Sequence, residues 1–261
     1  MTVNRPTSVS SWVERLSLDA VAVALGWGLA LGGDHAGGLE VLLLATWLTY
    51  VADRLWEVRP GRTAPRTDRH LFYQRHYRMW RLIWAGGFLL AVGLAVLRLP
   101  AWKLVGGWIL VAGIVVYLYI LGKGLSPDIR LALKRTVVPL IFTAGVLWMT
   151  ESWRQPELLL GTGVLLCGAL VNVILVTLHE RPDRELPELL RLLYACGMGG
   201  LMGLAVIGLM LGPAVAWSAS AAFTGFFILR MLILRRRPGR LRLAADLVLL
   251  LAGCVFLVAQ S

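Results

Sequence analysis

The stretch LLLGTGVLLCGALVNVILVTL, residues 158–178, runs for 21 positions without a charged residue. A helix needs roughly 20 predominantly apolar residues to cross the hydrocarbon core of a bilayer. This segment therefore predicts a transmembrane helix. The residues on either side of it are polar and charged, with Arg154 and Glu157 before it and His179 and Glu180 after it.

Eight further apolar runs have the same character, so the chain is predicted to be an all-α polytopic membrane protein. It should form a bundle of nine transmembrane helices in a single domain, residues 1–261. The second and fifth runs are short, and we expect their helices to continue past Asp53 and to begin before Lys134. The eight runs are 17–33, 38–52, 80–97, 105–121, 137–149, 189–211, 214–234 and 243–259.

Composition and charge agree with this reading. Only 16% of the residues are charged, against about 25% in a typical soluble domain, and the mean hydropathy is +0.72. With a cytoplasmic N-terminus, 23 of the 26 Lys and Arg residues fall in cytoplasmic regions, and only Arg98, Lys103 and Arg154 fall outside. This asymmetry predicts an inner (plasma) membrane protein with its N-terminus in the cytoplasm and its C-terminus outside.

The net charge of +11 does not indicate nucleic-acid binding, because the excess lies on loops that flank the membrane. There it fixes the topology and contacts anionic membrane lipids. The three cysteines lie inside apolar runs at spacings that match no metal motif, and we interpret them as packing residues. They are Cys167, Cys196 and Cys254.

The first candidate site follows the second apolar run and reads TYVADRLWE, residues 49–57. Asp53 and Glu57 are four residues apart, so on a continuing helix their carboxylates share one face. Such a pair can bind Mg²⁺ together with a substrate phosphate. By spacing alone, the pair is more often a solvated helix end in which Asp53 contacts Arg54.

Two basic segments add candidate ligands. Residues 66–78 interleave basic and aromatic side chains, which fits an interfacial helix that contacts either the lipid surface or an anionic substrate. His70 and His76 are six apart and form a weak metal site at best. Lys134 and Arg135 are either membrane anchors or a binding pair for a diphosphate.

A third cluster ends the sixth run, where Glu180 and Asp183 form a possible second acidic pole. Asn172, inside the run, needs a hydrogen-bond partner and serves either to join helices or to line a polar cavity. Two acids near the cytoplasmic ends of the first and ninth runs have an arginine four residues earlier, and we expect structural pairs. These pairs are Asp19 with Arg15 and Asp246 with Arg242.

Nine spans, with charged loops after the second and the sixth, resemble the UbiA superfamily of membrane prenyltransferases. The N-D-x-x-D-x-x-x-D motif of that family falls on residues 49–57. Asp53 stands for the middle aspartate and Glu57 for the last, whereas Thr49 and Tyr50 replace the leading Asn-Asp pair.

The second family motif, D-x-x-x-D, falls on residues 179–183, where Asp183 matches and His179 replaces the first aspartate. Lys134 and Arg135 resemble the Lys-Arg pair that precedes the fifth helix of the family. The similarity in layout covers nearly the whole chain, although the matched motif residues are few.

The resemblance implies a prenyltransferase that moves an isoprenyl group from an allylic diphosphate to a lipid-soluble or aromatic acceptor. Mg²⁺ and nearby cations would stabilise the departing diphosphate. The implied metal ligands are Asp53, Glu57, Glu180 and Asp183. The implied catalytic residues are Asp53, Glu57 and Asp183, and the implied substrate-binding residues are Arg54, Lys134, Arg135, Arg184 and Asn172.

Several aspartates of the family motifs are replaced in this chain, and a site with fewer carboxylates binds Mg²⁺ more weakly. A second hypothesis therefore remains. On this hypothesis the chain is a non-catalytic protein of UbiA-like fold that binds an isoprenoid or another lipid, or a membrane partner protein. A transporter is less favoured, since the sequence has no evident internal repeat or broken helix pair.

Overall fold

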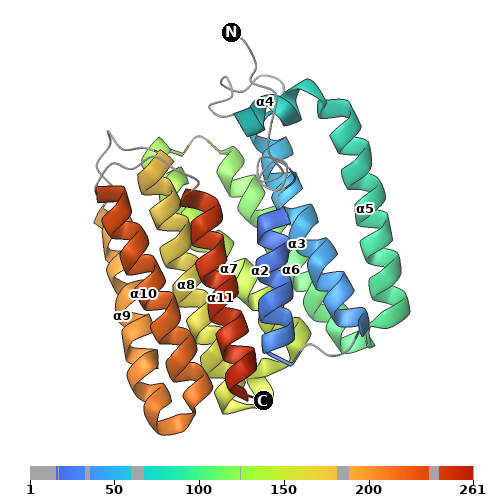
Figure 1. Cartoon of the computed structure of the whole chain (residues 1–261). Helices are drawn as coiled ribbons and strands as arrows, with labels where there is room; N and C mark the ends of the chain where they lie inside the picture. Colours follow the sequence, from blue (N-terminus) through green and yellow to red (C-terminus); the bar gives the residue numbers. More distant parts are fainter. Residues whose placement is uncertain are drawn as a thin grey trace.

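The computed structural model describes residue 16 and residues 18–32, 36–59, 68–123, 125–180, 188–234 and 241–260. These residues form helices and no strand, with the long helices side by side in a bundle (Figure 1). The long helices are α2 (Leu18–Ala30), α3 (Ala36–Glu57), α5 (Tyr77–Arg98), α6 (Ala101–Gly122), α7 (Pro127–Thr150), α8 (Pro156–Glu180), α9 (Glu188–Leu211), α10 (Pro213–Leu234) and α11 (Leu241–Gln260). Two short helices are α4 (Asp68–Arg75) and the 3₁₀ turn η1 (Ser152–Arg154).

Proline marks where three of these helices begin. Pro127, Pro156 and Pro213 are the first residues of α7, α8 and α10. Backbone N–H groups in the first turn of a helix make no hydrogen bond within the helix, so proline, which lacks an N–H, costs nothing there. The fixed φ of proline also matches the helical value. At α7 the Ser126 side chain also accepts a hydrogen bond from the backbone N–H of Ile129, at 3.3 Å.

The two short apolar runs are extended as expected. Helix α3 continues through Asp53 to Glu57, and α7 begins at Pro127, before Lys134. Pro139 consequently lies inside α7 rather than near its start. The apolar run marks only the later part of α7, and the first turns of the helix contain four charged residues, Asp128, Arg130, Lys134 and Arg135.

Six described helices are long and apolar enough to cross a membrane: α5, α6, α7, α8, α9 and α10. Helix α2 and residues Ala244–Gln260 of α11 are shorter apolar helices. Large apolar side chains point outward, among them Leu97 at 80% and Met210 at 88% exposure. Such a surface fits contact with lipid, so the fold is that of a polytopic helical membrane protein.

The main core lies between α2, α8, α10 and α11, where Trp27 is fully buried. The Trp27 indole N–H donates to the Leu249 carbonyl of α11 at 2.9 Å, and its ring lies 6.1 Å from that of Phe256. Ser218 of α10 donates to the Ala252 carbonyl at 2.8 Å. These bonds satisfy buried polar groups while they join neighbouring helices.

Helices α6 and α7 are joined by a buried charge, Lys103, which is 3% exposed. Its ammonium group donates to the Met149 carbonyl at 3.0 Å and pairs with Glu151 at 2.8 Å. Glu151 caps α7 in the left-handed region, with φ 58°, and also pairs with Arg154 at 3.0 Å. These ion pairs offset the strain that a non-glycine residue has at positive φ.

Next to this ion pair, Gly106 of α6 gives room to the Trp148 ring of α7. The Trp148 N–H donates to the Lys103 carbonyl at 3.1 Å, and a Cβ at Gly106 would overlap the Trp148 ring. A Cβ at the next residue, Gly107, would meet nothing within 4 Å.

We predict that Gly106→Ala lowers the free energy of unfolding by about 1–3 kcal/mol, the usual cost of overpacking. Gly107→Ala is the matched control and should be neutral or slightly stabilising, because alanine favours the helix by about 1 kcal/mol. Thermal unfolding of the purified protein in detergent measures both. Equal effects of the two substitutions would contradict this account of the α6–α7 contact.

Candidate functional site

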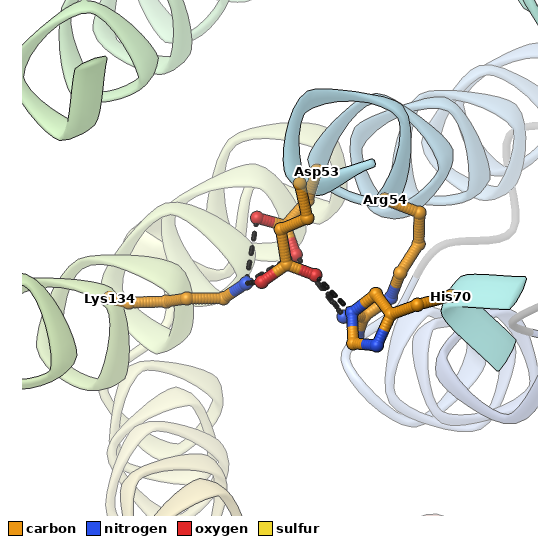
Figure 2. Close-up of polar contacts among 5 residues, drawn as sticks. Asp53, Arg54, His70 and Lys134 are labelled. Atoms are coloured by element: carbon orange, nitrogen blue, oxygen red, sulfur yellow. Dashed lines mark hydrogen bonds and ion pairs between the residues drawn. The ribbon is translucent and has the colours of Figure 1, made fainter. Parts of the chain in front are cut away.

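Five polar residues from three helices meet at the end of the bundle where α4 lies, and we call them the ion cluster (Figure 2). Asp53, Arg54 and Glu57 stand near the C-terminal end of α3, His70 comes from α4, and Lys134 comes from α7. Because α3 stays helical to its last residue, the i, i+4 spacing puts Asp53 and Glu57 on one face. The cluster therefore joins segments that are far apart in the sequence.

Lys134 occupies the centre of the ion cluster. Its ammonium group lies 2.9 and 2.7 Å from the two oxygens of Asp53 and 2.6 Å from Oε1 of Glu57. The Lys134 side chain is 17% exposed and the Asp53 side chain 15%. One cation thus bridges two carboxylates of α3, with little water around it.

Arg54 and His70 contact the other oxygen of Glu57. The Arg54 guanidinium donates to Oε2 at 2.8 Å, and His70 Nε2 lies 2.7 Å from the same atom. Arg54 also lies 3.7 Å from Asp53. Both oxygens of each carboxylate therefore have a partner within the cluster.

This environment changes the acidity of Glu57. Burial alone would raise the pKa of its carboxyl group, because it disfavours the charged form. The positive charges of Lys134 and Arg54 and the hydrogen bonds from His70 and Lys134 outweigh burial, and they hold the pKa of Glu57 well below its usual range. Glu57 is therefore a carboxylate at neutral pH.

The described residues alone do not fit a Mg²⁺ site. They contain no group of three or more His, Cys, Asp or Glu side chains that could hold a metal ion. The carboxylate oxygens of Asp53 and Glu57 already contact Lys134, Arg54 and His70. A metal ion would have to displace these cations and gain ligands from elsewhere in the chain.

The second predicted acidic pole lies mostly outside the described residues. His179 and Glu180 are the last two residues of α8, but neither side chain is described. Asp183 and Arg184 fall in the segment 181–187, outside the described part of the chain. That this pole faces the ion cluster thus stays a prediction.

Asn172 contacts another polar group inside the bundle. Its Nδ2 donates to Oδ1 of Asp246 at 2.6 Å, which joins α8 to α11. Asp19, 4% exposed, accepts from the backbone N–H of Ala20 at 3.0 Å. The expected pairs of these two acids with Arg15 and Arg242 stay predictions. Residue 15 lies outside the described residues, and the side chain of residue 242 is not described.

Helix α4 covers part of the basic and aromatic segment 66–78 and packs against the protein. Tyr73 is fully buried in a cluster with Val51 of α3 and Trp80 of α5, and the rings of Tyr73 and Trp80 are 4.9 Å apart. The segment is therefore more than a lipid-surface helix, since it also places His70 in the ion cluster.

Two further residues of this region were not assigned a role from the sequence. His70 looked like half of a weak metal site, and only the packing of α4 shows that it reaches Glu57. Tyr117 of α6 lies within a long apolar run, and the charges of Asp53, Glu57 and neighbouring arginines act on its hydroxyl group. No spacing rule relates either residue to α3.

Comparison of the chain with models of protein families, with curated proteins and with solved structures finds no match in any of the three.

The lowered pKa of Glu57 predicts a pH dependence of stability. A carboxyl group whose pKa is lower in the folded state contributes stability that is fully present above its unfolded pKa, about 4.3, and is lost as the pH falls through the folded pKa. The melting temperature of wild type should exceed that of Glu57→Gln between about pH 7 and pH 5, and the difference should shrink below about pH 4.

Glu188→Gln, at the exposed first residue of α9, is the control and should show a much smaller difference throughout. A difference between wild type and Glu57→Gln that grows as the pH falls below about 4 would contradict the charge balance described for the ion cluster.

Proposed function

We propose that the chain is a nine-span integral membrane protein of UbiA-like architecture, with one domain over residues 1–261. On this proposal the N-terminus lies in the cytoplasm and the C-terminus outside, in the inner (plasma) membrane. Two observations support it: a helix covers all or most of every predicted apolar run, and the basic residues divide strongly between the two sides. Helix α3 counts as a span on this proposal, although Glu40, Asp53 and Arg54 lower its hydropathy.

The topology predicts opposite locations for two reporter fusions. A reporter fused after Trp102 should lie outside the cell, and one fused after Arg237 should lie in the cytoplasm, because an odd number of spans separates them. A pair of reporters, one active only outside and one only in the cytoplasm, measures this. The same location for both fusions would exclude the nine-span arrangement.

We further infer that the ion cluster binds the phosphate groups of a lipid, with an isoprenyl diphosphate as the expected ligand. The observation that supports this most directly is the bridge from Lys134 to Asp53 and Glu57. Two segments that the resemblance assigns to one diphosphate site are in contact, although Lys134 and Asp53 are 81 positions apart.

The chemistry of the ion cluster suits this ligand. Lys134 and Arg54 supply an ammonium and a guanidinium group, and Arg135 follows Lys134 on α7. Phosphate oxygens are strong acceptors for such donors and can compete with carboxylates for them. The surrounding helices are apolar, as a binding site for a prenyl chain requires.

A second candidate function, Mg²⁺-dependent prenyl transfer to a lipid-soluble or aromatic acceptor, is favoured by one feature. Asp53 and Glu57 contact the same ammonium group, at 2.7 and 2.6 Å, so they are close enough to share one ion. Mg²⁺ would supply charge stabilisation of the leaving diphosphate. Glu180 and Asp183 would complete its ligands.

Binding of farnesyl diphosphate to the detergent-solubilised protein tests the proposal. We expect Lys134→Met to weaken binding about tenfold or more, since a charge-assisted hydrogen bond is worth about 1.5–3 kcal/mol. Lys123→Met, at an exposed lysine that stacks on Tyr119, is the control and should bind like wild type. Lys134→Arg keeps the charge and tests whether a loss reflects misfolding.

The same samples separate the two functions. Product formation from a labelled allylic diphosphate, with and without Mg²⁺, should be lost in Asp53→Asn and Asp183→Asn if the protein is a transferase. Binding without turnover by wild type would support the lipid-binding function alone. Absence of binding by wild type would overturn both, and mass spectrometry of co-purified lipids would then identify what the protein holds.

A further inference from the structure

Tyr117 lies on the face of α6 that turns toward the bundle. The buried residues of this helix are Lys103, Gly106, Tyr117 and Leu121, and their spacing is that of one helical face. Tyr119, two residues later, points away and is 62% exposed. Tyr117 itself is 7% exposed, so its ring and hydroxyl group are inside the protein.

The hydroxyl oxygen of Tyr117 is buried and has no hydrogen-bond partner among the described residues. A buried hydroxyl group normally finds a partner, because it loses its hydrogen bonds to water on burial. Phenylalanine would fill the same space without this cost. The hydroxyl group at this position therefore points to a partner that is not part of the described protein.

The surroundings of the hydroxyl group identify the kind of partner. Helix α6 packs against both α3 and α7, the helices that carry most of the ion cluster. The charges of Asp53, Glu57, Arg135 and Arg54 act on the hydroxyl group, in keeping with a position near the cluster. Yet it bonds to neither carboxylate, and the oxygens of these carboxylates already contact Lys134 or, for one oxygen of Glu57, Arg54 and His70. A phenol beside cations, with the local acceptors already engaged, is suited to donate to an anionic oxygen of a bound ligand.

We propose that Tyr117 is a ligand-binding residue that donates a hydrogen bond to a phosphate oxygen of the lipid bound at the ion cluster. This inference rests on the proposed function and adds α6 to the helices that contact the ligand. It gives the site a neutral donor on the side formed by α6, in addition to the cations of α3 and α7.

Replacement of Tyr117 by phenylalanine removes the hydroxyl group and little else. We expect farnesyl diphosphate to bind Tyr117→Phe about tenfold more weakly than wild type, the usual effect of one lost hydrogen bond. Tyr119→Phe removes a hydroxyl group from the exposed face of the same helix and should bind like wild type. Inorganic diphosphate, tested in parallel, should show the same loss if the contact is to phosphate.

The melting temperature without ligand distinguishes ligand binding from a structural role. Tyr117→Phe should be as stable as wild type or more stable without ligand, and should gain less stability when farnesyl diphosphate is added. If wild type binds and Tyr117→Phe binds equally well, or if the variant loses the same stability with and without ligand, the inference is overturned while the proposed function stands. If wild type itself does not bind, both fail.

Discussion

The arrangement of the ion cluster depends on one ammonium group placed between two carboxylates. Lys134 of α7 contacts Asp53 and Glu57 of α3 at 2.7 and 2.6 Å, and the three side chains are largely buried. Without this cation, two negative charges on one helix face would repel each other, and their burial would be costly. With Lys134 in place, the end of α3 is held against α7, and Arg54 and His70 contact the remaining oxygen of Glu57, Oε2.

Two largely buried lysines, Lys103 and Lys134, connect α7 to its neighbouring helices, in two places and with different partners. After the last turn of α7, Lys103 reaches from α6 to the capping residue Glu151 and to the Met149 carbonyl. In the first half of α7, Lys134 reaches across to α3. Lipid tails are as apolar as leucine, so helices in a membrane are held together mainly by close packing and polar contacts. The lysine ties and the fit of Trp148 over Gly106 are contacts of this kind.

The sequence predicted the parts of this structure that depend on local pattern. Apolar runs located the helices, and the i, i+4 spacing placed Asp53 and Glu57 on one face. The contacts of His70 with Glu57 and of Asn172 with Asp246 could not be predicted, because they join residues 13 and 74 positions apart and depend on how whole helices pack. The position of Tyr117 near these charges could not be predicted either, because a tyrosine in an apolar run looks like an ordinary packing residue.

The charge balance of the ion cluster bears on how a ligand enters it. Asp53 and Glu57 carry two negative charges, and Lys134 and Arg54 carry two positive charges, so these four residues are neutral together. A metal ion arriving alone would face two cations and carboxylates that are already paired. A diphosphate arriving alone would add negative charge, which the next residue of α7, Arg135, would offset only in part. In a poorly hydrated site either imbalance is costly. On the proposed function, a diphosphate that brought its own counter-ion would avoid both costs, because its oxygens would bind Lys134 and Arg54 while the counter-ion would bind the released carboxylates.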